Sequence, residues 1–312
     1  MAQPLRVALV AEEAAGARTF KLVVDSGHEL VLVVTTADAT SPTAGAARAA
    51  GAVLEEPGIV REAAFAERLR DARVDLLLNV HSLLIVRPDA LGVPSVGSFN
   101  LHPGPLPEWA GLDAPSWAIA AGASTYGCTV HWMNAGIDAG PIAYATTFPV
   151  SDRDTGLSLS ARCAREGLVL LARLLEAAGS GASAIPATPQ AAAGRRYFRR
   201  GPPGDGVVDW DTSGESIDRF VRACDFHPLP SPWAPAPRTW AGGRELRILK
   251  TLPTSEPARA DPGTVARVAG GAAFVAAGDT LVQISSVAVK GQPTPAGAVL
   301  QPGMVLETQP SR

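Results

Sequence analysis

The sequence predicts an α/β protein with a Rossmann-like parallel-sheet domain followed by a smaller β-barrel of the OB-like kind. In the first half, short apolar runs alternate with segments of helical periodicity, as in βαβ units. From residue 244 onward only short alternating runs occur, separated by Gly, Pro and Asp, which is typical of a small barrel. Residues 177–194 have the Ala, Gly, Ser and Pro content of a linker or lightly held connection. We therefore expect domains at 1–185 and 212–312, joined by a linker at 186–211.

Composition places the chain among globular proteins without a large polyanionic partner. It has 312 residues, 46% of them hydrophobic, enough for one large core or two ordinary ones. The net charge is −3, and no basic run is longer than the pairs Arg195-Arg196 and Arg199-Arg200, so no nucleic-acid partner is expected. The 3 cysteines fit neither a disulfide framework nor a CxxC metal pattern. No apolar stretch approaches the roughly 20 residues that span a bilayer, so we expect a cytoplasmic protein with no membrane partner.

The first part of the chain predicts a βαβ unit followed by a buried central strand. The crossover of this unit should be right-handed. No GxGxxG follows the first strand, and no GxxxxGK[ST] occurs, which disfavours a nicotinamide or nucleoside-triphosphate enzyme. The expected elements are strands at residues 5–10, 29–35 and 75–80, helices at 14–26 and 59–72, and a loop at 37–47.

A polar pair stands at the end of the next strand, residues 95–102. Alternate side chains of a strand share one face, so Asn100 and His102 point the same way and Leu101 points the other. A Pro-rich loop follows immediately and stops the regular structure. The carboxyl ends of strands in open parallel sheets are where ligands bind, so the pair marks a candidate site.

A carboxylate is expected to join this pair. A helix begins at Asp113 and ends at Gly122, and residues 125–133 form the next strand. If this strand is parallel to its neighbour, the loop at 134–140 delivers Asp138 to the same sheet edge. A further strand at residues 141–150 and a long helix at 154–178 complete the first domain.

The second domain opens with a helix at residues 212–225. Thr212 and Glu215 have the spacing of a capping box ahead of an apolar periodic run. Prolines between residues 228 and 237 then prevent regular structure. The alternating runs of the barrel follow.

Three elements resemble the folate-dependent formyltransferase family, which includes glycinamide ribonucleotide, methionyl-tRNA, sugar and specialised-metabolite formyltransferases. They are Asn-x-His-Pro at residues 100–103, GLDAPSWAI from Gly111, and GCTVHWMNAGIDAGPI from Gly127. The resemblance implies that Asn100, His102 and Asp138 are catalytic, that 10-formyltetrahydrofolate is the cosubstrate, and that an amine accepts the formyl group. It also implies a formyltransferase domain followed by a small barrel, as in the methionyl-tRNA and sugar formyltransferases.

The same resemblance suggests which loops hold the ligands. In the family, the loop after the central strand offers main-chain groups to the pterin ring of the folate. The implied folate-binding residues are His81, Ser82, Leu83, Leu84, Ile85 and Val86, with Gly136 and Ile137. The implied residues for the acceptor substrate are Pro103, Gly104, Trp109 and Gly111.

Each catalytic residue has a chemical role that suits formyl transfer. The reaction needs a donor to the oxyanion and a proton for the departing nitrogen. The amide of Asn100 can stabilise the oxyanion without ionising, and His102 can donate beside it. An ionised Asp138 would hold one tautomer of His102, raise the pKa of this imidazole and help remove the proton of the amine.

Other polar residues are less informative. His131 shares a strand face with Thr129 and Met133, so a packed or supporting role stands beside contact with substrate. No set of His, Cys, Asp and Glu has metal-ligand spacing, and no metal site is expected.

Several activities fit these residues. Water in place of the amine would make the protein a 10-formyltetrahydrofolate hydrolase, and methylene-tetrahydrofolate would make it a hydroxymethyltransferase. A folate-binding sensor without activity is a non-enzyme alternative, although the intact polar triad speaks against it. A nucleic-acid module in the barrel is disfavoured, because Phe274 is the only aromatic residue after Arg244.

The acceptor is expected to be a small or carrier-tethered amine of specialised metabolism. The motifs AGLDAPSWAI, HWM and DFHPLPSPW resemble formyltransferases of such pathways. Methionyl-tRNA formylation is the alternative, but residues 37–47 contain no Lys or Arg to contact an acceptor stem. The identity of the amine and the oligomeric state stay open.

Overall fold

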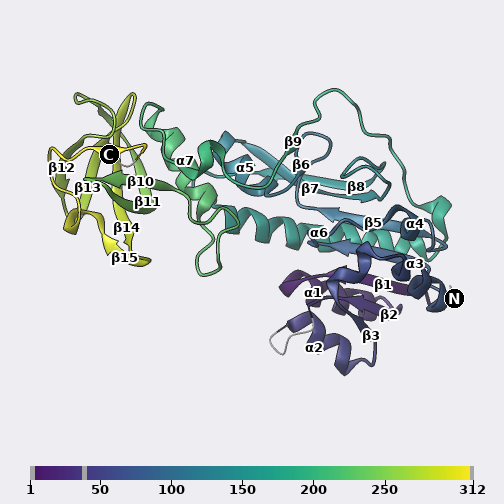
Figure 1. The fold of residues 1–312 in the computed structure, drawn as a ribbon. Helices are drawn as coiled ribbons and strands as arrows, with labels where there is room; N and C mark the ends of the chain where they lie inside the picture. Colours follow the sequence, from purple (N-terminus) through teal and green to yellow (C-terminus); the bar gives the residue numbers. More distant parts are fainter. Residues whose placement is uncertain (1–3, 37–40, 310–312) are drawn as a thin grey trace. The chain divides into compact units, whose positions relative to one another are not determined.

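The computed structural model describes residues 4–36 and 41–309, and its chain forms two compact units (Figure 1). Unit 1 holds the described residues up to Ala114, Thr125–Pro149 and Ala161–Phe198. Unit 2 holds Pro115–Ser124, Val150–Ser160 and the described residues from Arg199 onward. The two units therefore interleave along the sequence, and the expected boundaries at 185 and 212 stay a prediction.

Unit 1 is built on one sheet with the strand order β3-β2-β1-β4-β5-β7-β8. The first five strands in this order are parallel, whereas β7 is antiparallel to both β5 and β8. The predicted Rossmann-like domain is confirmed, and the parallel direction of β7, on which the predicted approach of Asp138 was conditional, is not found. The strands are β1 Arg6–Ala11, β2 Glu29–Val34, β3 Val53–Glu55, β4 Leu76–Val80, β5 Gly97–His102, β7 Thr125–Trp132 and β8 Ile142–Pro149.

The helices of unit 1 follow the predicted pattern in part. Residues 42–47, expected in a loop, belong to helix α2, because Ser41 caps its amides and Pro42 suits the first turn. Residues 37–40 of the expected loop lie outside the described residues. The expected helix at 59–72 is two elements, a 3-10 turn and α3. The helices are α1 Glu13–Asp25, α2 Pro42–Ala49, the turn η1 Pro57–Arg61, α3 Ala63–Asp71, α4 Pro88–Leu91 and α6 Gly156–Ala178, the last of which begins in unit 2.

The core of unit 1 fixes which face of β5 is free for chemistry. Leu101 is buried, and Gly167 of α6 lies so close that a Cβ there would stand 2.5 Å from the Leu101 side chain. Figure 1 shows α6 running alongside β5, β7 and β8. Since side chains alternate along β5, Asn100 and His102 face away from this packed side.

A short parallel pair joins two segments that are far apart in the sequence. β6 (Ala110–Gly111) pairs with β9 (Tyr197–Phe198) in a two-stranded sheet. Sequence patterns did not predict either strand, because two residues are too few to show a period. The pair brings the segment after α6 to the loop that follows β5.

Unit 2 contains a short helix α5 (Ala114–Ala121, which begins in unit 1), helix α7 (Gly214–Cys224) and an antiparallel sheet. Its strand order is β12-β13-β14-β11-β10-β16, with β15 beside β14, and the bridge Thr264–Val305 links its two ends. The predicted small barrel domain is thus confirmed. The cap of α7 is Ser213, which accepts from Ser216 N, and not the predicted Thr212. The strands are β10 Arg238–Ala241, β11 Arg244–Pro257, β12 Val265–Ala269, β13 Ala272–Ala276, β14 Thr280–Val289, β15 Gln292–Pro295 and β16 Leu306–Glu307.

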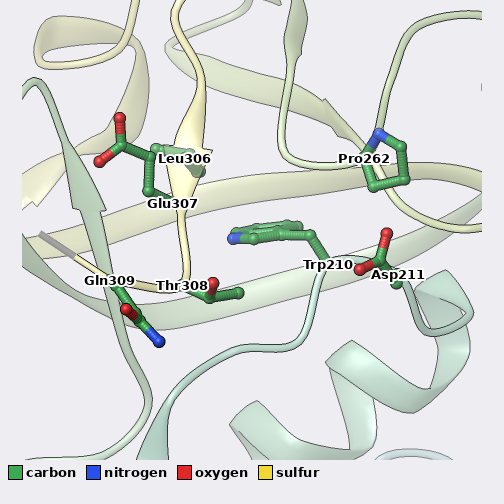
Figure 2. A pocket seen from close by; sticks show the side chains of 7 residues that line it. All are labelled: Trp210, Asp211, Pro262, Leu306, Glu307, Thr308 and Gln309. Carbon is green, nitrogen blue, oxygen red and sulfur yellow. The ribbon is translucent and has the colours of Figure 1, made fainter. Parts of the chain in front are cut away.

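A cavity of about 500 Å³ opens on unit 2, between β16 and the segment that leads into α7. Figure 2 shows the indole of Trp210 among Glu307, Thr308 and Pro262. The indole is buried, and its Nε1 donates to Thr239 Oγ1 at 3.1 Å. This cavity contains none of the residues expected to act in catalysis. Among the described helices, none is long and apolar enough to cross a membrane.

Candidate active site

The register of three neighbouring strands gathers polar side chains on one face of the unit 1 sheet. Asn100 of β5 stands opposite Asn79 of β4 and His131 of β7, and His102 stands opposite Thr129. Opposite residues of paired strands point to the same face. The polar pair expected from alternation therefore forms part of a wider group, to which the central strand contributes Asn79.

The amide of Asn100 is oriented by its neighbours. Asn79 Nδ2 donates to Asn100 Oδ1 at 3.1 Å, which leaves the Asn100 Nδ2 group as a donor. His131 Nδ1 donates to the Trp132 carbonyl at 2.8 Å, so its Nε2 accepts from Asn100 Nδ2 at 3.1 Å. The second Asn100 hydrogen faces Asp138 Oδ1 at 3.5 Å, a long and weak contact. His131 thus supports Asn100.

His102 is held in a single tautomer by a main-chain carbonyl. Its ring is 3% exposed, and Nε2 donates to the Trp109 carbonyl at 2.6 Å. Because a carbonyl only accepts, the proton lies on Nε2. His102 Nδ1 then faces Asp138 Oδ1 at 3.5 Å with its lone pair.

The pKa of His102 moves opposite to the expected direction. Burial lowers the pKa of this imidazole, and that effect outweighs the raising effects of Asp138 and the Trp109 carbonyl. His131 and Arg195 lower it further. The expectation that Asp138 raises the pKa of His102 is therefore wrong in its net result. At neutral pH the ring is neutral, and Nδ1 can accept a proton.

Asp138 reaches the group from a hairpin loop. β7 runs against β5 and ends at Trp132, opposite Phe99, so the loop between β7 and β8 must turn back to bring Asp138 to His102. Asp138 itself has φ 49°, a left-handed conformation that Asp tolerates better than most residues. The antiparallel hairpin thus delivers the carboxylate that a parallel strand was expected to deliver.

The carboxyl of Asp138 is buried and ionised. Burial alone would raise the pKa of Asp138, but the imidazoles of His102 and His131 and the amide of Gly111 outweigh it and lower this pKa to about 2. Gly111 N donates to Asp138 Oδ2 at 2.9 Å, and this bond favours the ionised form even when His102 is neutral. The site therefore combines a carboxylate with a neutral imidazole.

Two of the residues expected to bind the acceptor, Trp109 and Gly111, contact the predicted catalytic side chains through their main chain. The Trp109 carbonyl holds His102, and the Gly111 amide holds Asp138. A Cβ at Gly104 would lie 2.9 Å from His102 Nε2, so this position needs glycine. Pro103 O accepts from Tyr126 Oη at 2.8 Å. Binding of substrate by these residues stays a prediction.

The loop expected to bind folate begins at His81, close to the catalytic group. Burial, and repulsion from His102 when that ring is protonated, lower the pKa of His81 to about 4. Leu83 and Ile85 are 62% and 59% exposed, whereas Val86 packs in the core. Ser82 and Leu84 are half-buried, and Ser82 Oγ accepts from Leu84 N.

The second part of the expected folate site lies in the hairpin loop. Gly136 N donates to Asn134 Oδ1 at 3.0 Å, and the Ile137 side chain is largely exposed next to Asp138. The loop after β4 and the hairpin loop thus both expose apolar side chains. A role of either loop in folate binding stays a prediction.

Three contributors to the site were not identified from the sequence. Asn79 is a polar residue inside the apolar strand LLLNV, a signal that could have been used. Gln190 and Arg195 donate to carbonyls of the hairpin loop between β7 and β8, residues 133–141, which we call the Asp138 loop. Their segment has the composition of a linker, and no sequence signal points to these bonds.

Other reactive groups lie outside this cluster. Burial raises the pKa of Cys128 and Cys224 to about 12 and that of Cys163 further, so these thiols stay protonated. In the described ranges, no group of three or more His, Cys, Asp and Glu side chains is arranged to hold a metal ion.

Comparison with known protein families gives two matches. Residues 13–175 match the family described as "Formyl transferase". Residues 202–301 match the family described as "Formyl transferase, C-terminal domain". The first match contains Asn100, His102 and Asp138, and the second contains helix α7 and the strands of the barrel from β10 to β15.

Several curated relatives and solved structures are similar to the chain. The methionyl-tRNA formyltransferase of Alcanivorax borkumensis is 29% identical over 301 residues, which cover 93% of this chain and 88% of that protein. That of Thermobifida fusca is 33% identical over 245 residues, covering 74% and 76%. Glycinamide ribonucleotide transformylase 1 of Symbiobacterium toebii has a TM-score of 0.51 and 26% identity, covering 57% of this chain and 88% of that one. The N-formyltransferase of Helicobacter canadensis, in complex with folinic acid and dTDP-3-aminofucose, has a TM-score of 0.67 and 15% identity, covering 90% and 98%.

Proposed function

Since this chain belongs to the folate-dependent formyltransferase family, we propose that it moves the formyl group of 10-formyltetrahydrofolate to an amine in the cytoplasm. One observation carries the mechanism: a neutral His102 lies between the Trp109 carbonyl and the ionised carboxylate of Asp138. Such an imidazole can take a proton and return it, which is what the transfer of an acyl group between two nitrogens requires.

The first step is attack by the amine on the formyl carbon. A C–N bond forms, and the carbonyl oxygen becomes an oxyanion. Asn100 Nδ2 is the donor for this oxyanion, because its contact with Asp138 Oδ1 at 3.5 Å is weak and can be exchanged. Asn79 and His131 hold the amide plane during the reaction.

The second step moves one proton and breaks one bond. His102 Nδ1 takes the proton of the attacking nitrogen, and the imidazolium is stabilised by the Asp138 carboxylate. The same proton then passes to N10 of the folate as the bond between N10 and the formyl carbon breaks. With a pKa near 2, Asp138 is a weak base, so its role is electrostatic.

The folate is proposed to lie against the loop after β4 and the hairpin loop. Leu83, Ile85 and Ile137 expose apolar side chains there, and main-chain groups of residues 81–86 and 136–137 would contact the pterin. The Helicobacter protein of the same fold binds folinic acid. Pro103, Gly104, Trp109 and Gly111 would border the acceptor amine.

The acceptor is proposed to be a small or carrier-tethered amine, as in specialised metabolism. The chain has 27 basic and 30 acidic residues, and a net charge of −3 gives little attraction for a polyanion. Methionyl-tRNA is the second candidate, because two of the relatives named above share most of their length with this chain and act, by name, on that substrate.

A competition between acceptors tests this choice. The purified protein is incubated with 10-formyltetrahydrofolate and either initiator methionyl-tRNA or a panel of amino sugars and amino acids, with mass spectrometry of the products. We expect a formylated small amine and only weak, salt-sensitive binding of tRNA. A higher kcat/KM for methionyl-tRNA at physiological salt than for every small amine would assign the second candidate.

A further inference from the structure

The segment that follows the expected end of the catalytic domain is bonded closely to unit 1. Thr188 and Ile142 exchange two main-chain hydrogen bonds at the edge of the sheet. Residues 190–198, which we call the clamp segment, then contact the Asp138 loop and β6. We infer that the clamp segment is part of the active site and that Gln190 and Arg195 are positioning residues for Asp138. The inference rests on the proposed function.

Gln190 contributes two hydrogen bonds to the backbone of the Asp138 loop. Its Nε2 donates to the Asp138 carbonyl at 3.0 Å and to the Gly140 carbonyl at 2.7 Å. Its Oε1 is buried and has no hydrogen-bond partner in the described structure. A buried acceptor without a partner is unfavourable. If residue 190 served only to pack the structure, an apolar side chain would therefore be more stable there. The donor group is the feature that this position needs.

Arg195 binds the same backbone with both arms of its guanidinium. Nη1 donates to the Asp138 carbonyl at 2.9 Å, and Nη2 donates to the Ile137 carbonyl at 2.7 Å. The planar fork matches two consecutive carbonyls, whereas a lysine ammonium could bond one of them well. Together, Gln190 and Arg195 make four hydrogen bonds to the carbonyls of Ile137, Asp138 and Gly140, and so hold the main chain on both sides of the Asp138 side chain.

The Asp138 loop depends on such support. It lies outside β7 and β8, and Asp138 has a left-handed backbone with φ 49°. Its carboxylate meets His102 and His131 only at 3.5 Å, and Gly111 N makes its one short side-chain bond, at 2.9 Å. A displacement of about 1 Å at such a position can reduce a rate by about 100-fold.

The clamp segment also holds residues 109–112, which include β6 and contact the side chains of His102 and Asp138. The Arg196 carbonyl accepts from Ala110 N at 3.1 Å, and the Phe198 carbonyl accepts from Leu112 N at 2.9 Å. The Phe198 ring stacks on Trp109 at 5.1 Å, and the Arg196 guanidinium lies 4.5 Å above the Trp109 ring. Because the Trp109 carbonyl holds His102, one segment positions both members of the His102–Asp138 pair.

Arg195 adds a charge as well as hydrogen bonds. The ionisable groups that act on His102 are His81, His131, Asp138 and Arg195, and the guanidinium opposes protonation of the imidazole. Replacement of Arg195 by Ala should remove both effects, whereas replacement by Lys should keep the charge and lose the fork. The two variants thus separate position from charge.

The experiment compares R195A, R195K and Q190L with R165A, a surface control on α6 whose ion pair with Glu166 is exposed. We expect R195A and Q190L to lower kcat by about 10- to 100-fold with less than about threefold change in KM for the folate. R195K should keep the acidic limb of the wild-type pH profile while kcat stays low, and R195A should move that limb to higher pH. R165A should match the wild type.

A second readout does not depend on turnover. In protein labelled with ¹³C at the aspartate carboxyls, the Asp138 signal should shift and broaden in R195A and Q190L but not in R165A. If the wild type forms no formylated amine, the proposed function fails, and this signal still tests the clamp. Folded R195A and Q190L proteins with kcat within about twofold of wild type, or with an unchanged Asp138 signal, would overturn the inference.

Discussion

The side chains that we propose to be catalytic are held in two different ways. Asn100, His102 and His131 sit on paired strands, where register fixes the direction of each side chain. Asp138 sits in a hairpin loop, where donors from the clamp segment fix the backbone. The strand-borne groups of this site therefore follow from local sequence, whereas its loop-borne group depends on contacts from a distant segment.

The strand-borne group should show the largest effect of a single change. We expect His102→Ala to reduce kcat by about 100- to 10,000-fold, because the proton carrier is lost. Asp138→Ala should approach the same residual rate, and the double variant should lose little more, since the two act as one unit. Steady-state kinetics on the four proteins checks this, with circular dichroism to confirm folding. Independent, multiplying effects would break the proposed pairing.

Asn100 should show a smaller effect of the same kind. Loss of one oxyanion donor typically reduces kcat by about 100- to 1,000-fold, so we expect Asn100→Ala to fall in this range. Asn79→Ala removes the bond that orients the amide and should cost less. An equal loss of kcat for Asn79→Ala and Asn100→Ala would mean that the Asn100 amide stabilises the oxyanion only while Asn79 holds its orientation.

The pH dependence of kcat/KM tests the electrostatic side of the comparison. Catalysis needs neutral His102, and burial holds its pKa below the usual value of about 6.5. The His102 limb of the profile should therefore lie below about pH 6.5. Because the attacking amine must also be neutral, the acceptor adds a second limb at its own pKa, which Asp138→Asn leaves in place. Asp138→Asn removes a charge that raises this pKa, so the limb of its residual activity should move to still lower pH. A limb above about pH 7 in the wild type that moves in Asp138→Asn would contradict the neutral imidazole.

The smallest effect is expected outside both regions, at the cap of α7. Ser213→Ala should lower the free energy of unfolding by about 1 kcal/mol, because Ser213 Oγ caps Ser216 N. Glu215→Ala, at the position expected from the capping box, should change it less, since the Glu215 carboxylate is exposed where it pairs with Arg219. Chemical denaturation measures both, and kcat should stay near wild type. A larger loss of unfolding free energy for Glu215→Ala than for Ser213→Ala would favour the predicted capping box over the Ser213 cap.

Much of the fold and part of the site could be predicted from sequence. Alternation placed Asn100 and His102 on one face, and the family resemblance supplied Asp138, because short motifs and strand periods are local properties. The parallel direction of β7 was wrong, since one apolar run fits either direction. The helix at residues 42–49 was missed because its Ala- and Gly-rich sequence has little amphipathic period.

The electrostatics and the clamp could not be predicted in this way. A sequence shows that Asp138 can raise the pKa of His102, but it does not show burial, which is the larger effect. Gln190 and Arg195 lie more than 50 residues from Asp138 in a segment with linker-like composition. Their hydrogen bonds to the Asp138 loop depend on the tertiary structure and cannot be predicted from composition.

The most direct test of formyl transfer by the strand-borne group follows one labelled atom. The protein is incubated with 10-[¹³C]formyltetrahydrofolate and an amine panel, and NMR follows the carbon in wild type and His102→Ala. We predict that the label appears as a formamide on an amine while tetrahydrofolate is released, and that this signal disappears in His102→Ala. Label found only as formate, or a formamide formed equally fast by His102→Ala, would contradict the account.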